Sequence, residues 1–336
     1  MLLSKTQYLV WCGDDWKNYN KIKIGGKAKR KGGLGDRLRG MIATKSLARV
    51  LGLKFSMIWE ENMLDKLFEY PSYNDLDIKK DDIGVYSMLN SPELPILLSK
   101  EKPENIFTNK INKVLNNRPS WKFVLKNPHL NNVSTDNNID LEEFSQLYTH
   151  ILVPKPKMLS TVSKIIKGQK NIIGIQLRTG DKNMGVGKGV RDGLTLDSDS
   201  RILRMFKNIK KHLQVTYNDN YSIFLTSDYP NILKLGVEVW SQEQVLYYNK
   251  RITHIDKTRD KNSTDKTFID NYILSQKTEI IYASLSSGFS KIACLSSSHD
   301  NFYNIISFDT SKNDQQLLNI PKSNKKILIE WKKKVV

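Results

Sequence analysis

A run of apolar residues that leads directly into charged ones limits the fold of this chain more than any other feature. Residues 171–183 read NIIGIQLRTGDKN, and the first part has the length and β-branched content of a strand buried on both faces, as in a parallel sheet. Arg178 follows without a turn signal, and a buried arginine is costly unless it emerges at the strand end and meets an anion. We therefore predict a parallel α/β sheet with an anion-binding site at the carboxyl end of this strand.

Strand and helix patterns alternate on both sides of this run. A strand–helix–strand unit is expected over 6–12, 38–51 and 53–59. The apolar run at 151–159 breaks at two prolines and is the expected domain connection. Beyond it we expect helices at 158–168, 200–214, 231–236, 267–277 and 287–297, and strands at 171–177, 221–228, 238–240 and 279–285.

These patterns predict an α/β fold with two domains. We assign the amino-terminal domain to 1–150, a doubly wound carboxyl-terminal domain to 151–320, and a basic tail to 321–336.

The composition of the 336 residues excludes several classes of protein. Hydrophobic residues make up 39% and charged residues 26%, which is typical of a globular chain and not of a disordered one. No apolar run approaches the roughly 18 residues that span a bilayer. No signal peptide is recognised, so we expect a cytoplasmic protein. Cys12 and Cys294 are too few for a disulfide framework or a zinc site, and we expect both to be buried.

The formal net charge is +18. A field of this sign favours polyanions, acidic membrane surfaces or phosphorylated small molecules as partners, and a solvated basic surface is the simpler explanation. No zinc pattern, RNP motif or KH-type loop supports a nucleic-acid-binding protein. We expect no specific nucleic acid and keep peripheral contact with acidic surfaces as an expectation.

The segment GGLGDRLRG at 32–40 joins a glycine-rich turn to the start of a helix. Gly33 and Gly35 let a ligand approach the main chain, and the first helix amides, with Arg37 nearby, can hold a negative group. The alternative is a tight turn in which Asp36 caps the helix. The spacing matches neither the dinucleotide-binding glycine fingerprint nor a P-loop.

Two further motifs stand where strands are expected to end. Ser227 and Asp228 close the strand at 221–228, and Ser286, Ser287 and Gly288 stand where the strand at 279–285 becomes a helix. Hydroxyl groups and helix-start amides at strand ends suit a diphosphate. The same residues suit ordinary helix capping equally well.

The order of these motifs resembles that of the fucosyltransferase superfamily, which includes protein O-fucosyltransferases, core α1,6-fucosyltransferases and bacterial Nod-factor fucosyltransferases. The family's glycine-rich motif is similar to GLGDRLRGMIATKSLARVLG, and its H-x-R-x-[GT]-D motif is similar to IGIQLRTGDK. Its last motif is similar to DNYILSQKTEIIYASLSSGFSKIA. The matched segments are a minor part of the chain, but their order and spacing span most of it.

The resemblance implies a GT-B-type glycosyltransferase, in which two Rossmann-like domains face a cleft. By the resemblance, the amino-terminal domain is the expected acceptor side, and the carboxyl-terminal domain is the expected nucleotide-sugar side. The implied reaction is inverting, needs no metal ion or other cofactor, and moves L-fucose from GDP-fucose to a glycan or another hydroxyl acceptor. By the resemblance, Arg178 contacts the donor β-phosphate, and Asp270 lies near the guanine. Together with the residue patterns, it assigns catalysis to Arg178, Asp181 and Lys182, and donor binding to Gly33, Gly35, Asp36, Arg37, Gln176, Arg178, Ser227, Asp228, Asp270, Ser286, Ser287, Gly288 and Phe289.

Two positions depart from the family pattern. Gln176 stands where the family has a histidine, and a glutamine does not titrate near neutrality. The carboxylate that some members carry shortly after the motif is missing from 182–189. Asp181 and Asp192 are the candidates to accept the acceptor's proton, and Asp181 is also a candidate to orient Arg178. The DSDS segment at 197–200 is interpreted as a helix start and not as a metal motif.

Three alternatives stay open at this point. The donor can be another nucleotide sugar, such as a UDP-pentose. The chain can bind carbohydrate without transferring it, or it can be a basic nucleic-acid-binding protein.

Overall fold

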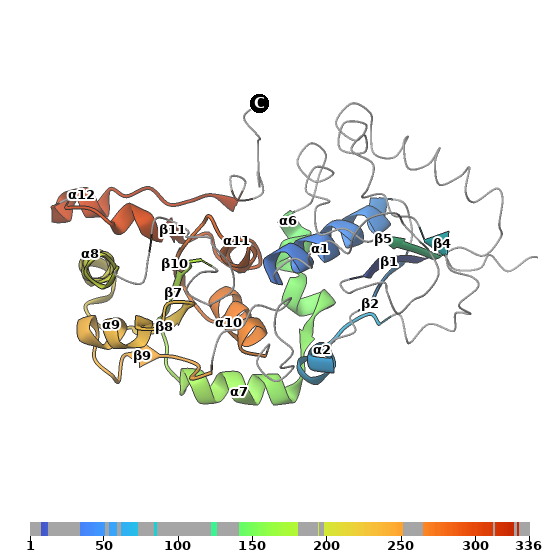
Figure 1. The fold of residues 1–336 in the computed structure, drawn as a ribbon, viewed down its shortest axis with the longest axis horizontal. Coiled ribbons are helices and arrows are strands. Elements are labelled where there is room, and N and C mark those ends of the chain that lie inside the picture. The colour runs from blue at the N-terminus through green and yellow to red at the C-terminus, as the bar shows by residue number, and fades with distance from the viewer. Residues whose placement is uncertain are drawn as a thin grey trace, which may run out of the picture. The chain divides into compact units, whose positions relative to one another are not determined.

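Figure 1 shows the computed structural model of the protein, which describes residues 8–12, 34–50, 54–58, 62–72, 84–85, 122–125, 141–180, 194, 198–250, 265–311, 313–325 and 328. Two compact units divide the chain between Val153 and Pro154, inside the segment expected to connect the domains, and the second unit ends at Leu328. Only 321–325 and 328 of the predicted basic tail are described. Among the helices in the described ranges, none combines the length and the apolar character that crossing a membrane requires.

The first unit contains a four-stranded sheet in the order β2-β1-β5-β4. Its neighbouring strands pair in parallel, and Tyr8 of β1 lies opposite Lys54 of β2. The predicted strand–helix–strand unit is confirmed. The elements are β1 (Tyr8–Cys12), α1 (Leu34–Val50), β2 (Lys54–Ile58), α2 (Asn62–Leu67), β3 (Phe68–Glu69), β4 (Gly84–Val85), β5 (Lys122–Leu125), α6 (Leu141–Ser145) and the π-helical turn η4 (Leu147–Ile151).

A buried carboxylate joins α1 to α6 within this unit. The side chain of Glu143 is 5% exposed and accepts a hydrogen bond of 2.6 Å from the Lys45 ammonium. The Arg49 Nε lies 3.4 Å from its other oxygen. Because a buried carboxylate is costly without partners, these two cations fix α6 against the carboxyl-terminal half of α1.

The second unit contains a five-stranded parallel sheet in the order β11-β10-β7-β8-β9. Within this unit, Figure 1 shows α8 and α9 on one side of the strands and α10 and α11 on the other. The elements are β6 (Val153–Pro154, which crosses the division), α7 (Pro156–Ile166), β7 (Ile172–Leu177), α8 (Asp199–Tyr217), β8 (Ser222–Ser227), α9 (Ile232–Val239), β9 (Val245–Leu246), α10 (Asp265–Gln276), β10 (Ile280–Ala283), α11 (Gly288–Leu295), β11 (Phe302–Asn304), the 3-10 turn η5 (Ile305–Phe308) and α12 (Asp314–Leu318).

Strand β7 is central, and all six of its residues are buried, as its apolar run predicts. Side chains of a strand alternate between faces. Ile173, Ile175 and Leu177 pack in the core cluster with α8 and α9. Gly174 faces α10, where an added Cβ would lie 2.8 Å from a Leu274 methyl group. Glycine at this position therefore lets α10 approach the sheet closely.

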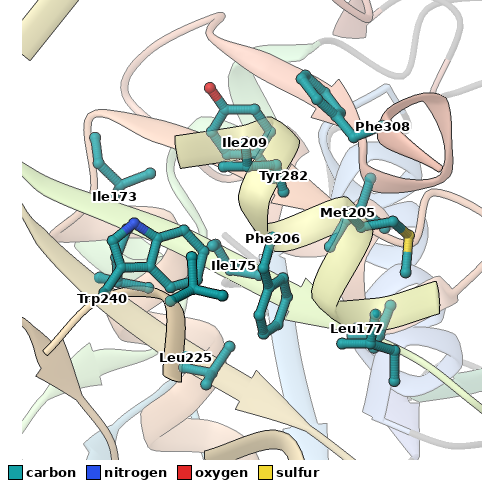
Figure 2. Packing of buried hydrophobic residues seen from close by; sticks show 14 of the residues in the cluster. Ile173, Ile175, Leu177, Met205, Phe206, Ile209, Leu225, Trp240, Tyr282 and Phe308 are labelled. Atoms are coloured by element: carbon teal, nitrogen blue, oxygen red, sulfur yellow. The ribbon is translucent and has the colours of Figure 1, made fainter. Parts of the chain in front are cut away.

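Aromatic side chains fill the core between the sheet and helices α8 and α9 (Figure 2). The rings of Phe206 and Trp240 have centroids 5.2 Å apart. The Trp240 indole N–H donates to the Tyr221 hydroxyl at 3.2 Å, so its one polar atom is satisfied inside the core. This packing holds the strands of the second unit in a fixed frame for the residues at their ends.

The prediction of a strand at 238–240 is wrong. Helix α9 continues through Val239, because Ile232, Leu235 and Val239 recur at helical spacing and are all buried. The edge strand is β9, which follows after a turn. The sequence also did not indicate β11 and α12, which are short.

Cys294 is buried and free, as predicted. Burial raises the pKa of its thiol, so this cysteine is an inert apolar group. The side chain of Cys12 lies outside the described residues.

Candidate donor-binding site

The strand order places a reversal point between β7 and β10. The chain leaves β7 through α8 to reach β8 on one side, and it leaves β10 through α11 to reach β11 on the other side. In open α/β sheets, ligands bind outside the carboxyl ends of the strands at such a reversal. Arg178 follows β7 directly, and Ser284 follows β10 directly, so both lie at this edge.

The two strand ends are tied to each other by hydrogen bonds. The backbone N–H of Arg178 donates to the Ser284 hydroxyl oxygen at 2.9 Å. The backbone N–H of Ser284 donates to the Gln176 carbonyl at 3.0 Å, which extends the parallel ladder past the end of β10. The main chain around Arg178 is therefore held from the β10 side.

Asp228, at the end of β8, holds the same segment from the other side. Its side chain is 1% exposed, and the Arg178 Nη1 lies 2.9 Å from its Oδ2. Its Oδ1 accepts from the backbone N–H and the hydroxyl of Thr179, at 2.7 and 3.0 Å, and its Oδ2 accepts from the backbone N–H of Gly180 at 3.0 Å. Gly180 has a φ of 113°, which favours glycine. One carboxylate thus organises the turn after β7 and orients Arg178.

The start of α11 supplies backbone donors near this edge. Ser287 is the N-cap residue with extended backbone, and its side chain makes no capping hydrogen bond. The first amides of a helix have no intrahelical acceptor and favour an anion. Ser286 is exposed, while Gly288 and Phe289 are half-buried. The Phe289 carbonyl accepts from the Asn271 amide at 3.0 Å, which anchors this turn on α10.

Two of the predicted donor-binding residues make buried contacts between the sheet and the helices of the second unit. The Gln176 Oε1 accepts a hydrogen bond from the Ser290 hydroxyl of α11. Asp270 is fully buried, and its Oδ2 accepts from the Thr226 hydroxyl at 2.6 Å and from the Lys266 ammonium at 2.8 Å. Burial raises the pKa of the Asp270 carboxyl, and the Lys266 cation opposes this shift.

Ser227 has a local role. Its hydroxyl oxygen accepts from the backbone N–H of Tyr229 at 3.0 Å, which closes the turn after β8. The sequence allowed two interpretations of this motif, a diphosphate site or an ordinary turn or helix cap. This contact fits the ordinary turn.

The glycine-rich motif lies in the first unit. Helix α1 begins at Leu34, so the interpretation of Asp36 as its N-cap is wrong, and Asp36 and Gly35 belong to its first turn. Arg37 is buried, with 1% of its surface exposed. Gly33 lies outside the described residues, as do Asp181, Lys182 and Asp192.

The DSDS segment starts a helix, as predicted. Ser198 is the N-cap residue of α8, and Asp199 is its first residue. The Tyr229 hydroxyl donates to the Asp199 Oδ1 at 2.6 Å, and the Asn231 amide lies 3.2 Å from the other oxygen. Within the described ranges, no group of three or more His, Cys, Asp or Glu side chains is suited to a metal ion.

Sequence patterns missed four residues that organise this region. Thr179 and Ser284 act through hydrogen bonds to residues distant in sequence, and no local pattern signals them. Ser290 was inside a recognised motif but had no assigned contact. Lys266 stands four residues before Asp270, a spacing that places both on one helix face, and this signal was available in the sequence.

No protein-family model and no curated protein sequence matches the chain. Solved structures do match. The NodZ α1,6-fucosyltransferase of Bradyrhizobium, soaked with GDP-fucose, has a TM-score of 0.51 and 14% identity, over 87% of this chain and 93% of that chain. A variant of Arabidopsis thaliana FUT1 in complex with GDP has a TM-score of 0.50 and 12% identity, over 89% and 71%. POFUT1 in complex with GDP has a TM-score of 0.50 and 11% identity, over 88% and 96%.

At these identities the likeness concerns the fold. The chain has the fold of the GT-B fucosyltransferases, so the predicted fold class and the predicted likeness in fold to these proteins are confirmed.

Proposed function

We propose that this protein is an inverting glycosyltransferase that moves a fucosyl group from GDP-fucose to a hydroxyl group of a glycan or another acceptor. The likeness to solved structures concerns the fold, and the proposal adds a catalytic activity to it. The observation that carries it is the position of Arg178, which stands at the reversal point of the sheet and is oriented by a buried carboxylate. The likeness to structures with bound GDP or GDP-fucose supports the same class of donor.

Arg178 suits the leaving diphosphate. A guanidinium presents five N–H donors in a planar fork that matches phosphate oxygens, and Asp228 accepts from its Nη1. The Asp228 carboxylate also accepts three hydrogen bonds from neutral donors of the turn after β7, so it does not depend on the arginine alone. The side chain of Arg178 remains 15% exposed. An arginine held in this way supports a developing negative charge with little reorganisation.

The proposed reaction is a single displacement at the anomeric carbon. The bond from this carbon to the diphosphate oxygen breaks, and the electron pair leaves with GDP. The acceptor oxygen forms the new bond on the opposite face and loses its proton. We propose that Arg178 and the first amides of α11 stabilise the leaving group without a metal ion. Asp181, Lys182 and Asp192 stay predictions for the proton acceptor and a second positive charge.

Asp270 supports guanine as the base of the donor. Its Oδ1 is buried and has no hydrogen-bond partner among the described residues. Guanine presents its N1–H and 2-amino donors on one edge, and a carboxylate oxygen with two lone pairs can accept from both. Uracil presents a single N–H between two carbonyl oxygens, which a carboxylate repels.

A thermal-shift screen against nucleotides tests this proposal. At about 100 times its dissociation constant, a ligand that binds the folded state alone stabilises by about 2.7 kcal/mol, or several degrees for a chain of this size. We expect GDP and GDP-fucose to shift the melting temperature most. A larger shift with UDP would contradict the base assignment. Tight binding of GDP-fucose with neither transfer nor hydrolysis would show a carbohydrate-binding protein without activity.

A further inference from the structure

Buried polar side chains form a layer under the carboxyl edge of the sheet, on the face covered by α10 and α11. Hydrogen bonds and an ion pair join its members in two groups, one across β7 and α11 and one across β8 and α10. The members are at most 4% exposed, and we call them the polar layer: Gln176, Thr226, Lys266, Asp270 and Ser290.

Lys266 is the least expected member of this layer, because lysine is almost never fully buried. Its ammonium group is 0% exposed and lies 2.8 Å from the Asp270 Oδ2. It also donates to the Tyr248 carbonyl at 2.8 Å, and it lies 4.5 Å from the centre of the Tyr247 ring. Two acceptors and the rings of Tyr247 and Tyr248 therefore surround this charge.

The ion pair leaves one oxygen of Asp270 unused. Lys266 and Thr226 both contact Oδ2, while Oδ1 is buried and has no partner among the described residues. A buried ion pair contributes little to stability, and an unsatisfied buried oxygen costs free energy. A chain that only needed packing here would gain from apolar residues. The arrangement therefore indicates a ligand for Oδ1.

We propose that Lys266 is a specificity-determining residue, which holds Asp270 as a carboxylate with Oδ1 presented to the N1–H and 2-amino groups of guanine. This inference rests on the proposed function, because it assumes a guanosine diphosphate donor. Lys266 itself is a positioning residue, since it acts on the nucleotide through Asp270.

The positive charge of Lys266 favours the ionised form of the Asp270 carboxyl. Burial raises the pKa of the Asp270 carboxyl above its usual range, and Lys266 is the cation that opposes this shift. In the part of the chain that the structure describes, the other titratable groups that act on this carboxyl are Asp265, on the same helix, and the Tyr247 phenol, from the segment after β9. Strand β8 contributes the Thr226 hydroxyl, which carries no charge. Removing Lys266 should therefore raise the pKa of this carboxyl further.

Two variants separate this role from a structural one. Lys266→Met removes the charge and leaves a thioether that packs on the Tyr247 ring. The double variant Lys266→Met with Asp270→Leu removes both partners, and replacing a buried ion pair by apolar residues of similar volume often leaves stability unchanged. Calorimetric titration with GDP, IDP and UDP, from about pH 6 to about pH 9, measures the affinity of each protein, and the melting temperature reports its folding. IDP keeps the N1–H of guanine and lacks the 2-amino group.

The wild-type protein should bind GDP more tightly than IDP and IDP more tightly than UDP, with a weaker dependence on pH than Lys266→Met. Lys266→Met should lose about 10- to 100-fold in GDP affinity near neutral pH, keep its UDP affinity, and regain GDP affinity as the pH rises. The double variant should bind the three nucleotides alike at every pH.

The inference is overturned if Lys266→Met binds GDP as the wild type does, or if it loses GDP and UDP affinity equally. If Lys266→Met does not fold, a folded double variant that still prefers GDP overturns it. A wild-type protein without preference for GDP overturns the guanine assignment of the proposed function itself, which is a distinct result.

Discussion

The Arg178 guanidinium and the Asp228 carboxylate form an ion pair of 2.9 Å across the ends of β7 and β8. The same carboxylate binds the backbone N–H groups of Thr179 and Gly180, so it positions the main chain as well as the side chain. Asp181 was the sequence candidate for orienting Arg178, and Asp228 performs this role in the structure. The donor contact assigned to Asp228 from sequence stays a prediction.

Replacing Arg178 should reduce turnover far more than stability. Loss of one preorganised electrostatic donor typically costs about 2.7–4 kcal/mol, or roughly 10²–10³ in rate. Arg178→Lys should recover little, because an ammonium cannot reproduce the planar fork. Asp228 keeps three donors in Arg178→Ala, so the free energy of unfolding should fall by only about 1 kcal/mol. Turnover, donor affinity and melting temperature of both variants check this. Near-normal turnover in Arg178→Ala would place the donor site elsewhere.

Asp228→Asn should reduce both activity and stability. The carboxamide presents an N–H₂ group where the carboxylate accepted, so at least one donor of the turn loses its partner. We expect a loss of about 1.5–3 kcal/mol in the free energy of unfolding. Turnover should fall by about 100-fold, because small displacements of a catalytic group are costly.

Asp309→Asn is the matched control for this prediction. Asp309 binds two arginines, Arg201 and Arg204 of α8, and joins that helix to the residues after η5. Its replacement removes an arginine–carboxylate contact outside the candidate site, so stability should fall while turnover of the folded protein stays unchanged. Equal loss of turnover in both variants would contradict the positioning role of Asp228.

The stability of the protein should fall as the pH drops from about 6.5 to about 4 because of His299. Burial, with a smaller contribution from Lys325, lowers the pKa of this imidazole from 6.5 to about 4. The unfolded chain therefore takes up a proton in this range before the folded chain does, and the proton stabilises the unfolded state. After discounting for partial exposure, the expected loss is about 1–2 kcal/mol.

His299→Asn isolates this effect. The Nδ1 of His299 accepts from the backbone N–H of Asn301 at 3.1 Å, and an asparagine oxygen can take the same bond. Denaturant unfolding at about pH 7 and about pH 4.5 should show a smaller loss of stability in the variant than in the wild type. Burial also lowers the pKa of His212, so the variant should keep part of the pH dependence. An identical loss in both proteins would contradict the assignment to His299.

Transfer activity should survive chelation with EDTA. In the proposed mechanism, Arg178 and the α11 amides supply the positive charge that the leaving group needs. The Asp199 carboxylate of the DSDS segment already binds Tyr229 and Asn231. Activity assays with EDTA, and with added Mn²⁺ or Mg²⁺, check this. Loss of activity that Mn²⁺ or Mg²⁺ restores would require a metal site in the mechanism.

Much of the second unit was predictable from sequence, because its signals are local. The β7 run is continuous and apolar, α8 carries a long helical pattern, and both appear in the structure within a few residues of the predicted ranges. The motif order indicated the fold class for a similar reason, since the motifs of the second unit follow the ends of β7, β8 and β10. Short elements were missed, because two or three residues, as in β9 and β11, carry too little pattern to exceed chance.

The sequence by itself determined that Arg178 follows a buried strand. It also determined that Ser286, Ser287 and Gly288 stand where a strand is followed by a helix. Only the tertiary structure decided which side chains meet there. Hydrophobic burial sets the pairing of β7 with β8 and β10, and this pairing brings Asp228 and Ser284 to Arg178. The burial of Asp270 with Lys266 is also a tertiary property, because the helical spacing places the two charges together but not inside the protein. Such contacts join segments that are distant along the chain, and no local pattern encodes which of them become neighbours.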